Sequence, residues 1–109
     1  MVKQGDIIKL SFSPQAGHEQ AGYRPAVVVS NNFFNTHTSL TILCPITNTN
    51  RPFPLHVPLN SRTKTSGTVL CEHVKALDLN SRPYTHIEKI PEDLLDEILS
   101  IVFSQIEKT

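Results

Sequence analysis

The chain contains 109 residues, with ten acidic and ten basic side chains and a formal net charge of zero. This length allows one domain with a modest core, so we expect a single domain over residues 1–109. The N-terminal residues lack a signal-peptide pattern and no apolar run reaches membrane-spanning length, which predicts a cytoplasmic protein without a membrane partner. In that compartment Cys44 and Cys71 are expected to be free, buried thiols.

Acidic and basic residues are unevenly distributed along the chain. The stretch 20–71 has no acidic residue and four basic ones, Arg24, Arg51, Arg62 and Lys64. Residues 72–109 carry eight acidic and four basic side chains. If this separation maps onto faces of the folded protein, it predicts a basic groove suited to a nucleic acid. The alternative is a fold that brings the two halves together and cancels the charges.

The first half of the chain predicts three short strands separated by turns. Residues 6–12 mix apolar and polar side chains in a strand-like way, and residues 24–30 are rich in valine, which is typical of a buried strand. The polar connection at 31–39 has room for a helical turn. Residues 40–47 predict the third strand, in which Pro45 requires an edge position or a bulge.

The second half of the chain predicts two more strands. Residues 55–59 form a short one, and residues 67–78 form a longer one that alternates after Val69. Alternation places successive side chains on opposite faces of a sheet. The pattern therefore predicts one face with Cys71, His73 and Lys75 and another with Glu72, Val74 and Ala76.

The C-terminal segment predicts the one long helix. Pro91 suits its first position, and the acidic residues that follow complement the helix dipole. A continuous apolar stripe at helical spacing comprises Leu94, Leu95, Ile98, Leu99, Val102, Phe103 and Ile106. We therefore predict a mainly β fold, a small SH3-like barrel of five to six strands with a C-terminal helix. Apolar surface left over from so small a core, including Phe33 and Phe34, predicts a homodimer.

A polar loop precedes the valine-rich strand and reads Gly17-His18-Glu19-Gln20-Ala21-Gly22-Tyr23-Arg24-Pro25. It brings a carboxylate, an amide, a phenol and a guanidinium to the start of a rigid strand, as in many functional sites. Pro25 biases Arg24 toward an extended backbone, so the guanidinium is held in place. Taken alone, this composition fits a polar turn better than a site.

Several motifs occur in a characteristic order. Glu19-Gln20-x-Gly22-x-Arg24-Pro25 is followed by Val27-Val28-Val29-Ser30, and the chain also contains Gly5-Asp6-Ile7-Ile8, Cys44-Pro45-Ile46-Thr47 and Gly67-Thr68-Val69-Leu70-Cys71-Glu72-His73-Val74-Lys75. Together they span nearly the whole chain and resemble the MazF/PemK family, the toxins of bacterial toxin–antitoxin pairs. The resemblance implies a small ribonuclease that cuts single-stranded messenger RNA, with the same barrel fold and a cognate antitoxin as protein partner.

The resemblance assigns the catalytic pair to Arg24 and Thr47. A ribose 2′-hydroxyl is the nucleophile in such an enzyme, so the protein has to accept its proton, stabilise the phosphorane and protonate the leaving 5′-oxygen. The Arg24 guanidinium suits the phosphorane, because it grips two phosphate oxygens and stays charged. The Thr47 hydroxyl positions the scissile phosphate, although a strand-end threonine also fits a simple turn hydrogen bond. Glu19 is a supporting catalytic residue that either accepts the 2′-hydroxyl proton or orients Arg24.

A further set of side chains is expected to bind RNA, which proteins read by stacking bases on aromatic rings and by hydrogen bonds to base edges. The candidates are Gln20, Tyr23, Asn48, Arg51, Phe53, His73 and Lys75. Tyr23 stands where some relatives in the family carry histidine, which puts a histidine-centred mechanism in doubt. Phe53 also fits a hydrophobic plug between two prolines, and His73 fits a solvent-facing strand residue.

The five histidines and two cysteines lack the spacing of metal ligands, so we expect no metal and no cofactor. Cleavage is then expected to be metal-independent. Two alternatives to a ribonuclease remain, namely a relative that binds RNA or a peptide without cutting and a toxin of the same fold directed at DNA gyrase. The presence of both Arg24 and Thr47 favours the ribonuclease.

Overall fold

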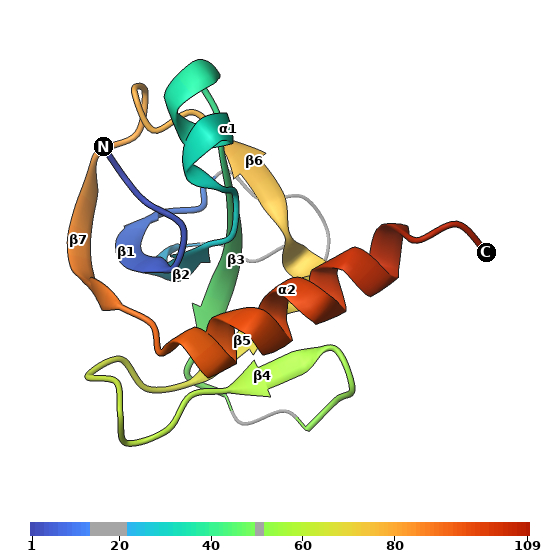
Figure 1. The fold of residues 1–109 in the computed structure, drawn as a ribbon. Coiled ribbons are helices and arrows are strands. Elements are labelled where there is room, and N and C mark those ends of the chain that lie inside the picture. Colours follow the sequence, from blue (N-terminus) through green and yellow to red (C-terminus); the bar gives the residue numbers. More distant parts are fainter. Residues whose placement is uncertain (14–21, 50–51) are drawn as a thin grey trace.

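Antiparallel strand pairs form the body of the molecule, and a long helix lies across them (Figure 1). The computed structural model describes residues 1–13, 22–49 and 52–109. Within these residues the strands are β1 (Asp6–Ser11), β2 (Tyr23–Val28), β3 (Thr41–Thr47), β4 (His56–Pro58), β5 (Thr68–Leu70), β6 (Lys75–Leu77) and β7 (Tyr84–Lys89). The helical elements are α1 (Asn32–His37), the 3-10 turn η1 (Cys71–His73) and α2 (Glu92–Ile106). The predicted mainly β fold with a C-terminal helix is confirmed.

The strands pair in the order β4-β5-β3-β2-β1-β7, and β6 pairs with a separate part of β3. Ile46 and Thr47 of β3 pair with β5, whereas Thr41, Ile42 and Leu43 pair with β6. The sheet bends around its core like a small barrel, although no ladder joins β4 to β7 in the described residues (Figure 1). The described chain has seven strands instead of the predicted five to six.

One additional strand is β7, which the sequence analysis missed. Its sequence is Tyr-Thr-His-Ile-Glu-Lys, and every position is exposed or half-buried. A strand with so few apolar side chains shows no hydrophobic alternation. It forms because its backbone completes an antiparallel ladder with β1.

The other difference is a break in the predicted strand 67–78. Lys75 follows Val69 by six positions in the sequence. Their partners on β3, Leu43 and Ile46, are only three positions apart. The 3-10 turn η1 takes up the difference and divides the segment into β5 and β6. The predicted alternation through this segment is therefore wrong.

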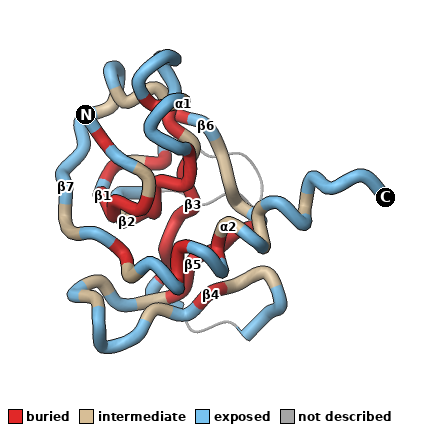
Figure 2. The backbone as a smooth tube through the Cα atoms, in the orientation of Figure 1, coloured by how far each residue is buried: buried red, intermediate tan, exposed pale blue. Residues whose placement is uncertain are grey.

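The core has two parts, because side chains on both faces of the central strands are buried. Figure 2 shows the buried segments gathered along β1, β2 and β3. Burial on both faces explains the uninterrupted valine run of β2. One cluster lies beneath α2 and includes Ile7, Val27, Cys44, Ile46, Leu95 and Ile98. The other lies on the opposite face and includes Ile8, Leu10, Phe12, Ala26, Val28, Leu43 and Leu77.

Helix α2 buries side chains fully in the first cluster only in its first half, whereas Leu99, Ile101 and Val102 pack against the cluster and are partly buried. Leu94, Leu95 and Ile98 are buried, whereas Phe103 is 62% exposed and Ile106 is 77% exposed. The C-terminal end of the helix projects beyond the sheet (Figure 1). Pro91 caps the helix from outside instead of occupying its first helical position. In the described part of the chain, no helix combines the length and the apolar character needed to cross a membrane.

Candidate functional site

Arg24 and Thr47 lie at adjoining ends of two paired strands. In the β2–β3 ladder Ala26 is opposite Pro45. Arg24 precedes Ala26 by two residues and Thr47 follows Pro45 by two, so both side chains keep the face of that pair. Arg24 is half-buried, and Thr47 is only 8% exposed. The structure therefore brings together the two predicted catalytic residues from separate parts of the sequence.

Thr47 is held by an unusually close backbone neighbour. Its strand partner is Thr68, and the preceding Gly67 has a φ of +126°. A Cβ atom at Gly67 would lie 2.2 Å from the carbonyl oxygen of Thr47 and 3.0 Å from its carbonyl carbon. Only glycine fits this approach and this φ. The role of Gly67 is not visible in the sequence beyond its place in a motif, because the contact exists only once β3 and β5 are paired.

The Thr47 hydroxyl also makes the turn hydrogen bond that its strand-end position suggested. Its Oγ1 accepts from the backbone N–H of Thr49 at 3.3 Å. A hydroxyl is one donor and two acceptors, so this bond leaves the O–H able to donate to a phosphate oxygen. The two interpretations of Thr47 are therefore compatible.

Replacing Gly67 with Ala is expected to lower the free energy of unfolding by about 1–3 kcal/mol, because the new methyl group forces the strained backbone away from Thr47. Thermal unfolding measures the loss, and an RNA-cleavage assay reports whether Thr47 has moved. The matched control is Gly22→Ala. Gly22 also has a positive φ, +82°, but a Cβ there would meet nothing within 4 Å. Equal losses in the two variants would contradict a specific role for the contact with Thr47.

Lys75 and His73 lie near the other end of β3 from Thr47. Lys75 is opposite Leu43 in the β3–β6 ladder, so alternation along β3 puts it on the same face as Thr47. His73 ends the turn η1 instead of lying in a strand. Both residues are half-buried. One face of the sheet thus carries a guanidinium, a hydroxyl and an ammonium group, with an imidazole on the adjoining turn.

Tyr23 is the first residue of β2, next to Arg24, and alternation directs it to the other face. Its ring is 57% exposed, and the Lys9 Nζ atom lies 5.3 Å from the ring centroid. This geometry is a cation–π contact. The structure therefore does not place Tyr23 on the face of the catalytic pair.

Phe53 lies in an exposed loop after β3, which argues against the alternative of a buried plug. The side chain is 52% exposed, and its ring centroid lies 5.1 Å from that of His56. His56 is itself paired with Glu72, whose Oε2 lies 2.7 Å from the imidazole Nε2. Sequence analysis missed this pair, because its members are 16 residues apart and belong to no recognisable motif. Asn48 is exposed directly after β3.

Three predicted site residues, Glu19, Gln20 and Arg51, lie outside the described residues. No group of three or more potential metal ligands occurs within residues 1–13, 22–49 and 52–109.

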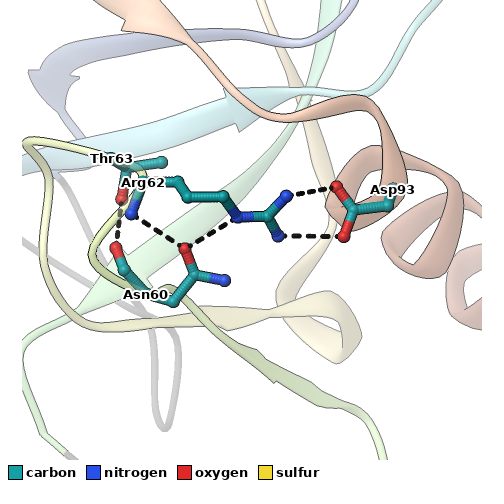
Figure 3. A network of polar contacts seen from close by, with 4 residues as sticks. All are labelled: Asn60, Arg62, Thr63 and Asp93. Carbon is teal, nitrogen blue, oxygen red and sulfur yellow. Dashed lines mark hydrogen bonds and ion pairs between the residues drawn. The ribbon is translucent and has the colours of Figure 1, made fainter.

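The acid-free stretch does not form one continuous basic surface. Arg62 makes two 2.9 Å hydrogen bonds to the carboxylate of Asp93 at the start of α2 (Figure 3). The hydrogen bond from Arg62 lowers the pKa of Asp93, and the same bond raises the pKa of Arg62. At this position the fold brings the two halves of the chain together, as the alternative interpretation stated.

The turn that follows Arg62 is fixed to β7 by a second acidic residue. Glu88 accepts hydrogen bonds from the backbone N–H groups of Lys64 and Thr65 and from the Thr65 hydroxyl. Burial raises the pKa of Glu88, but these hydrogen bonds outweigh it and hold the pKa below its usual value. Asp93 and Glu88 therefore interrupt the acid-free stretch as a basic surface in the folded protein.

Comparison with known proteins finds relatives that align with most of the chain. "Endoribonuclease PemK" of Escherichia coli is 33% identical over 102 residues, which cover 90% of this chain and 77% of the relative. "Endoribonuclease toxin MazF" of Escherichia coli (strain K12) is 35% identical over 91 residues, covering 83% of this chain and 81% of the relative.

Solved structures with similar sequences have the same fold. The crystal structure of MazF (Form-I) from Deinococcus radiodurans matches with a TM-score of 0.90 and 37% identity, and 96% of each chain is covered. The crystal structure of MazE–MazF (Form-III) from Deinococcus radiodurans matches with a TM-score of 0.85 and 33% identity over 99% of this chain and 98% of that one. Residues 3–105 also match the family described as PemK-like, MazF-like toxin of type II toxin–antitoxin system. The chain therefore belongs to the family of PemK-like, MazF-like toxins of type II toxin–antitoxin systems.

Proposed function

We propose that this protein is a toxin that acts as a sequence-specific, metal-independent endoribonuclease on single-stranded messenger RNA in the cytoplasm. The observation that carries the proposal is the convergence of Arg24 and Thr47 on one face at the adjoining ends of β2 and β3. The similar proteins named endoribonucleases support the same activity.

Cleavage proceeds by attack of the ribose 2′-oxygen on the neighbouring phosphorus. The bond from phosphorus to the 5′-oxygen breaks, which leaves a 2′,3′-cyclic phosphate and a free 5′-hydroxyl. Arg24 binds two nonbridging oxygens and stabilises the charge that grows on them in the transition state. The Thr47 hydroxyl donates to a phosphate oxygen and fixes its position. Glu19 is our candidate for accepting the 2′-hydroxyl proton or orienting Arg24.

RNA bases are expected to contact the rim of this face. Phe53 offers an exposed ring for stacking, and Lys75 offers a positive charge for the backbone. Gln20, Tyr23, Asn48, Arg51 and His73 complete the proposed set of RNA-binding residues.

The reaction is tested with a short single-stranded RNA that the protein cuts and with the same RNA carrying one 2′-deoxy sugar at the cut. The first is expected to yield cyclic-phosphate and 5′-hydroxyl ends, also in excess chelator, and the second to remain intact. Cutting of the deoxy substrate would overturn the mechanism, and loss of cutting in chelator would overturn metal independence. Tight RNA binding without cleavage would identify a binding protein instead.

We also propose that the protein is a homodimer that a cognate antitoxin inhibits. The ends of α1 and α2 border an apolar groove of about 230 Å³. Its apolar lining comprises Val29, Phe34, Ile42, Leu99, Val102, Phe103 and Ile106. Exposed apolar surface of this kind usually marks an interface, and a two-fold dimer is the commonest closed assembly. An acidic antitoxin segment suits the positively charged face and would compete with RNA there.

Light scattering at micromolar concentration tests the assembly. We expect a dimer mass for the wild type and a monomer mass for Phe103→Asp. Ser100→Asp adds the same charge at an exposed polar position of α2 and is expected to remain dimeric. A monomeric wild type with full activity would contradict the dimer. Inhibition by the cognate antitoxin that more RNA cannot relieve would contradict competition.

A further inference from the structure

Cys44 and Cys71 face each other in the core beneath α2. Ile46 is opposite Val69 in the β3–β5 ladder, and two further residues along each chain lead to Cys44 and Cys71. All four residues belong to one core cluster, and a hydrogen bond joins the side chains of Cys44 and Cys71. The two sulfur atoms are therefore neighbours in the folded core, as a disulfide requires.

The two thiols are free and fully buried, each with 0% of its surface exposed. A hydrogen bond with the Cys71 side chain is the main cause that raises the pKa of Cys44, and burial adds to it. The thiolate is the reactive form of cysteine, so a raised pKa keeps this thiol slow to react. Fast oxidation therefore requires a local opening of the structure.

The end of α2 is the part that has to open. The Gln105 side chain donates from Nε2 to the Cys71 carbonyl at 3.0 Å, which ties the last turn of α2 over the pair. Its Oε1 atom is buried and has no hydrogen-bond partner within the described residues. The neighbouring Phe103 and Ile106 are exposed, so their side chains add little packing to this turn. Weakly held helix ends open at low free-energy cost.

We propose that Cys44 and Cys71 form an oxidation site, at which a peroxide converts the two thiols into an intramolecular disulfide that joins β3 to η1. One thiolate attacks a peroxide oxygen and becomes a sulfenic acid, with release of water. The second thiol attacks the sulfenic sulfur and expels a second water. The pair loses two protons and two electrons, and one hydrogen peroxide is reduced to two waters.

The disulfide stabilises the fold without disturbing the catalytic pair. It closes the chain from residue 44 to residue 71, which includes β4, β5 and their connecting turn, and so restricts the unfolded state. The two thiols are already neighbours in the folded core, so Thr47 need not move when the bridge forms. RNA cleavage by the oxidised protein is therefore expected to stay within about twofold of the reduced protein.

The test treats the purified protein with hydrogen peroxide, removes the peroxide with catalase and alkylates the remaining thiols in denaturant. Mass spectrometry is expected to show no alkylated cysteine, one linked peptide pair holding Cys44 and Cys71, and recovery of both thiols on reduction. The melting temperature should rise by about 5 °C or more. Cys71→Ala and Cys44→Val, treated alike, should show no such rise.

The treatment is repeated in urea below the unfolding transition, which favours opening of α2. Two alkylated thiols under both conditions would overturn the proposal, as would sulfinic acid or a disulfide between two molecules as the main product. The thiol and melting measurements do not depend on ribonuclease activity, so they decide this site even if the proposed function fails.

Discussion

Replacing Arg24 with Ala is expected to lower the rate of RNA cleavage by about 10³-fold while the protein stays folded. Removing a single preorganised donor that faces developing charge costs about 10²–10³ in rate, and Arg24 supplies two donors and a full charge. The side chain is half-buried at the start of β2, so its loss leaves the two core clusters intact. Single-turnover cleavage with enzyme in excess measures the chemical step directly.

Two further variants test whether catalysis depends on the position and shape of the Arg24 side chain or only on its positive charge. Arg24→Lys keeps the charge but loses the planar fork, so an intermediate rate is expected. Arg62→Ala removes an equal charge elsewhere and breaks the exposed ion pair with Asp93 and the exposed hydrogen bond to Asn60, which contribute little to stability. Its cleavage rate should stay within about threefold of wild type. Comparable losses in Arg24→Ala and Arg62→Ala would show that overall charge matters and that Arg24 has no special place.

Replacing Thr47 with Val should lower the cleavage rate by about 10²-fold, because Val keeps the shape of the side chain and removes its hydroxyl. Thr47→Ser should restore much of the activity, since it returns the donor without the methyl group. Cleavage rates and melting temperatures of the three proteins are measured together.

Thr41→Val provides the structural control. Thr41 begins the same strand and is equally buried, at 5% exposed against 8% for Thr47, but lies at the other end of β3. Both valine variants lose a buried hydroxyl, and Thr47→Val also loses the hydrogen bond from Thr49, so a somewhat larger fall in melting temperature is expected for Thr47→Val. A Thr47→Val protein that cuts RNA as fast as Thr41→Val would reduce Thr47 to its turn hydrogen bond with Thr49.

The parts of the fold that the sequence predicts well are those with a strong apolar pattern. The valine run of β2 and the stripe of α2 are visible because burial of these residues dominates their local energetics. β7 has no such pattern and is held by backbone hydrogen bonds to β1, so residue types alone do not reveal it. The turn η1 arises from a mismatch of register between β3 and its two partners, which exists only in three dimensions.

In the candidate site, too, some features follow from sequence motifs and others exist only in the folded structure. The family resemblance named Arg24 and Thr47 as a catalytic pair before the strands were placed, and their roles stay a prediction. The approach of Gly67 to the Thr47 carbonyl and the pairing of His56 with Glu72 join residues that are distant in sequence. The basic groove predicted from the separation of charges along the chain is interrupted, because Arg62 from the acid-free stretch pairs with Asp93 from the acidic segment.

The central position of β3 affects the order in which parts of the molecule unfold. This strand pairs with β2, β5 and β6, and its side chains enter both core clusters. Amide hydrogens in such a strand exchange with solvent only when the whole domain unfolds, whereas those of the edge strands β4 and β7 exchange through smaller openings. A protease that degrades this toxin is therefore expected to cleave first in an edge strand, β4 or β7. Thr47 is expected to stay in place until the whole domain unfolds.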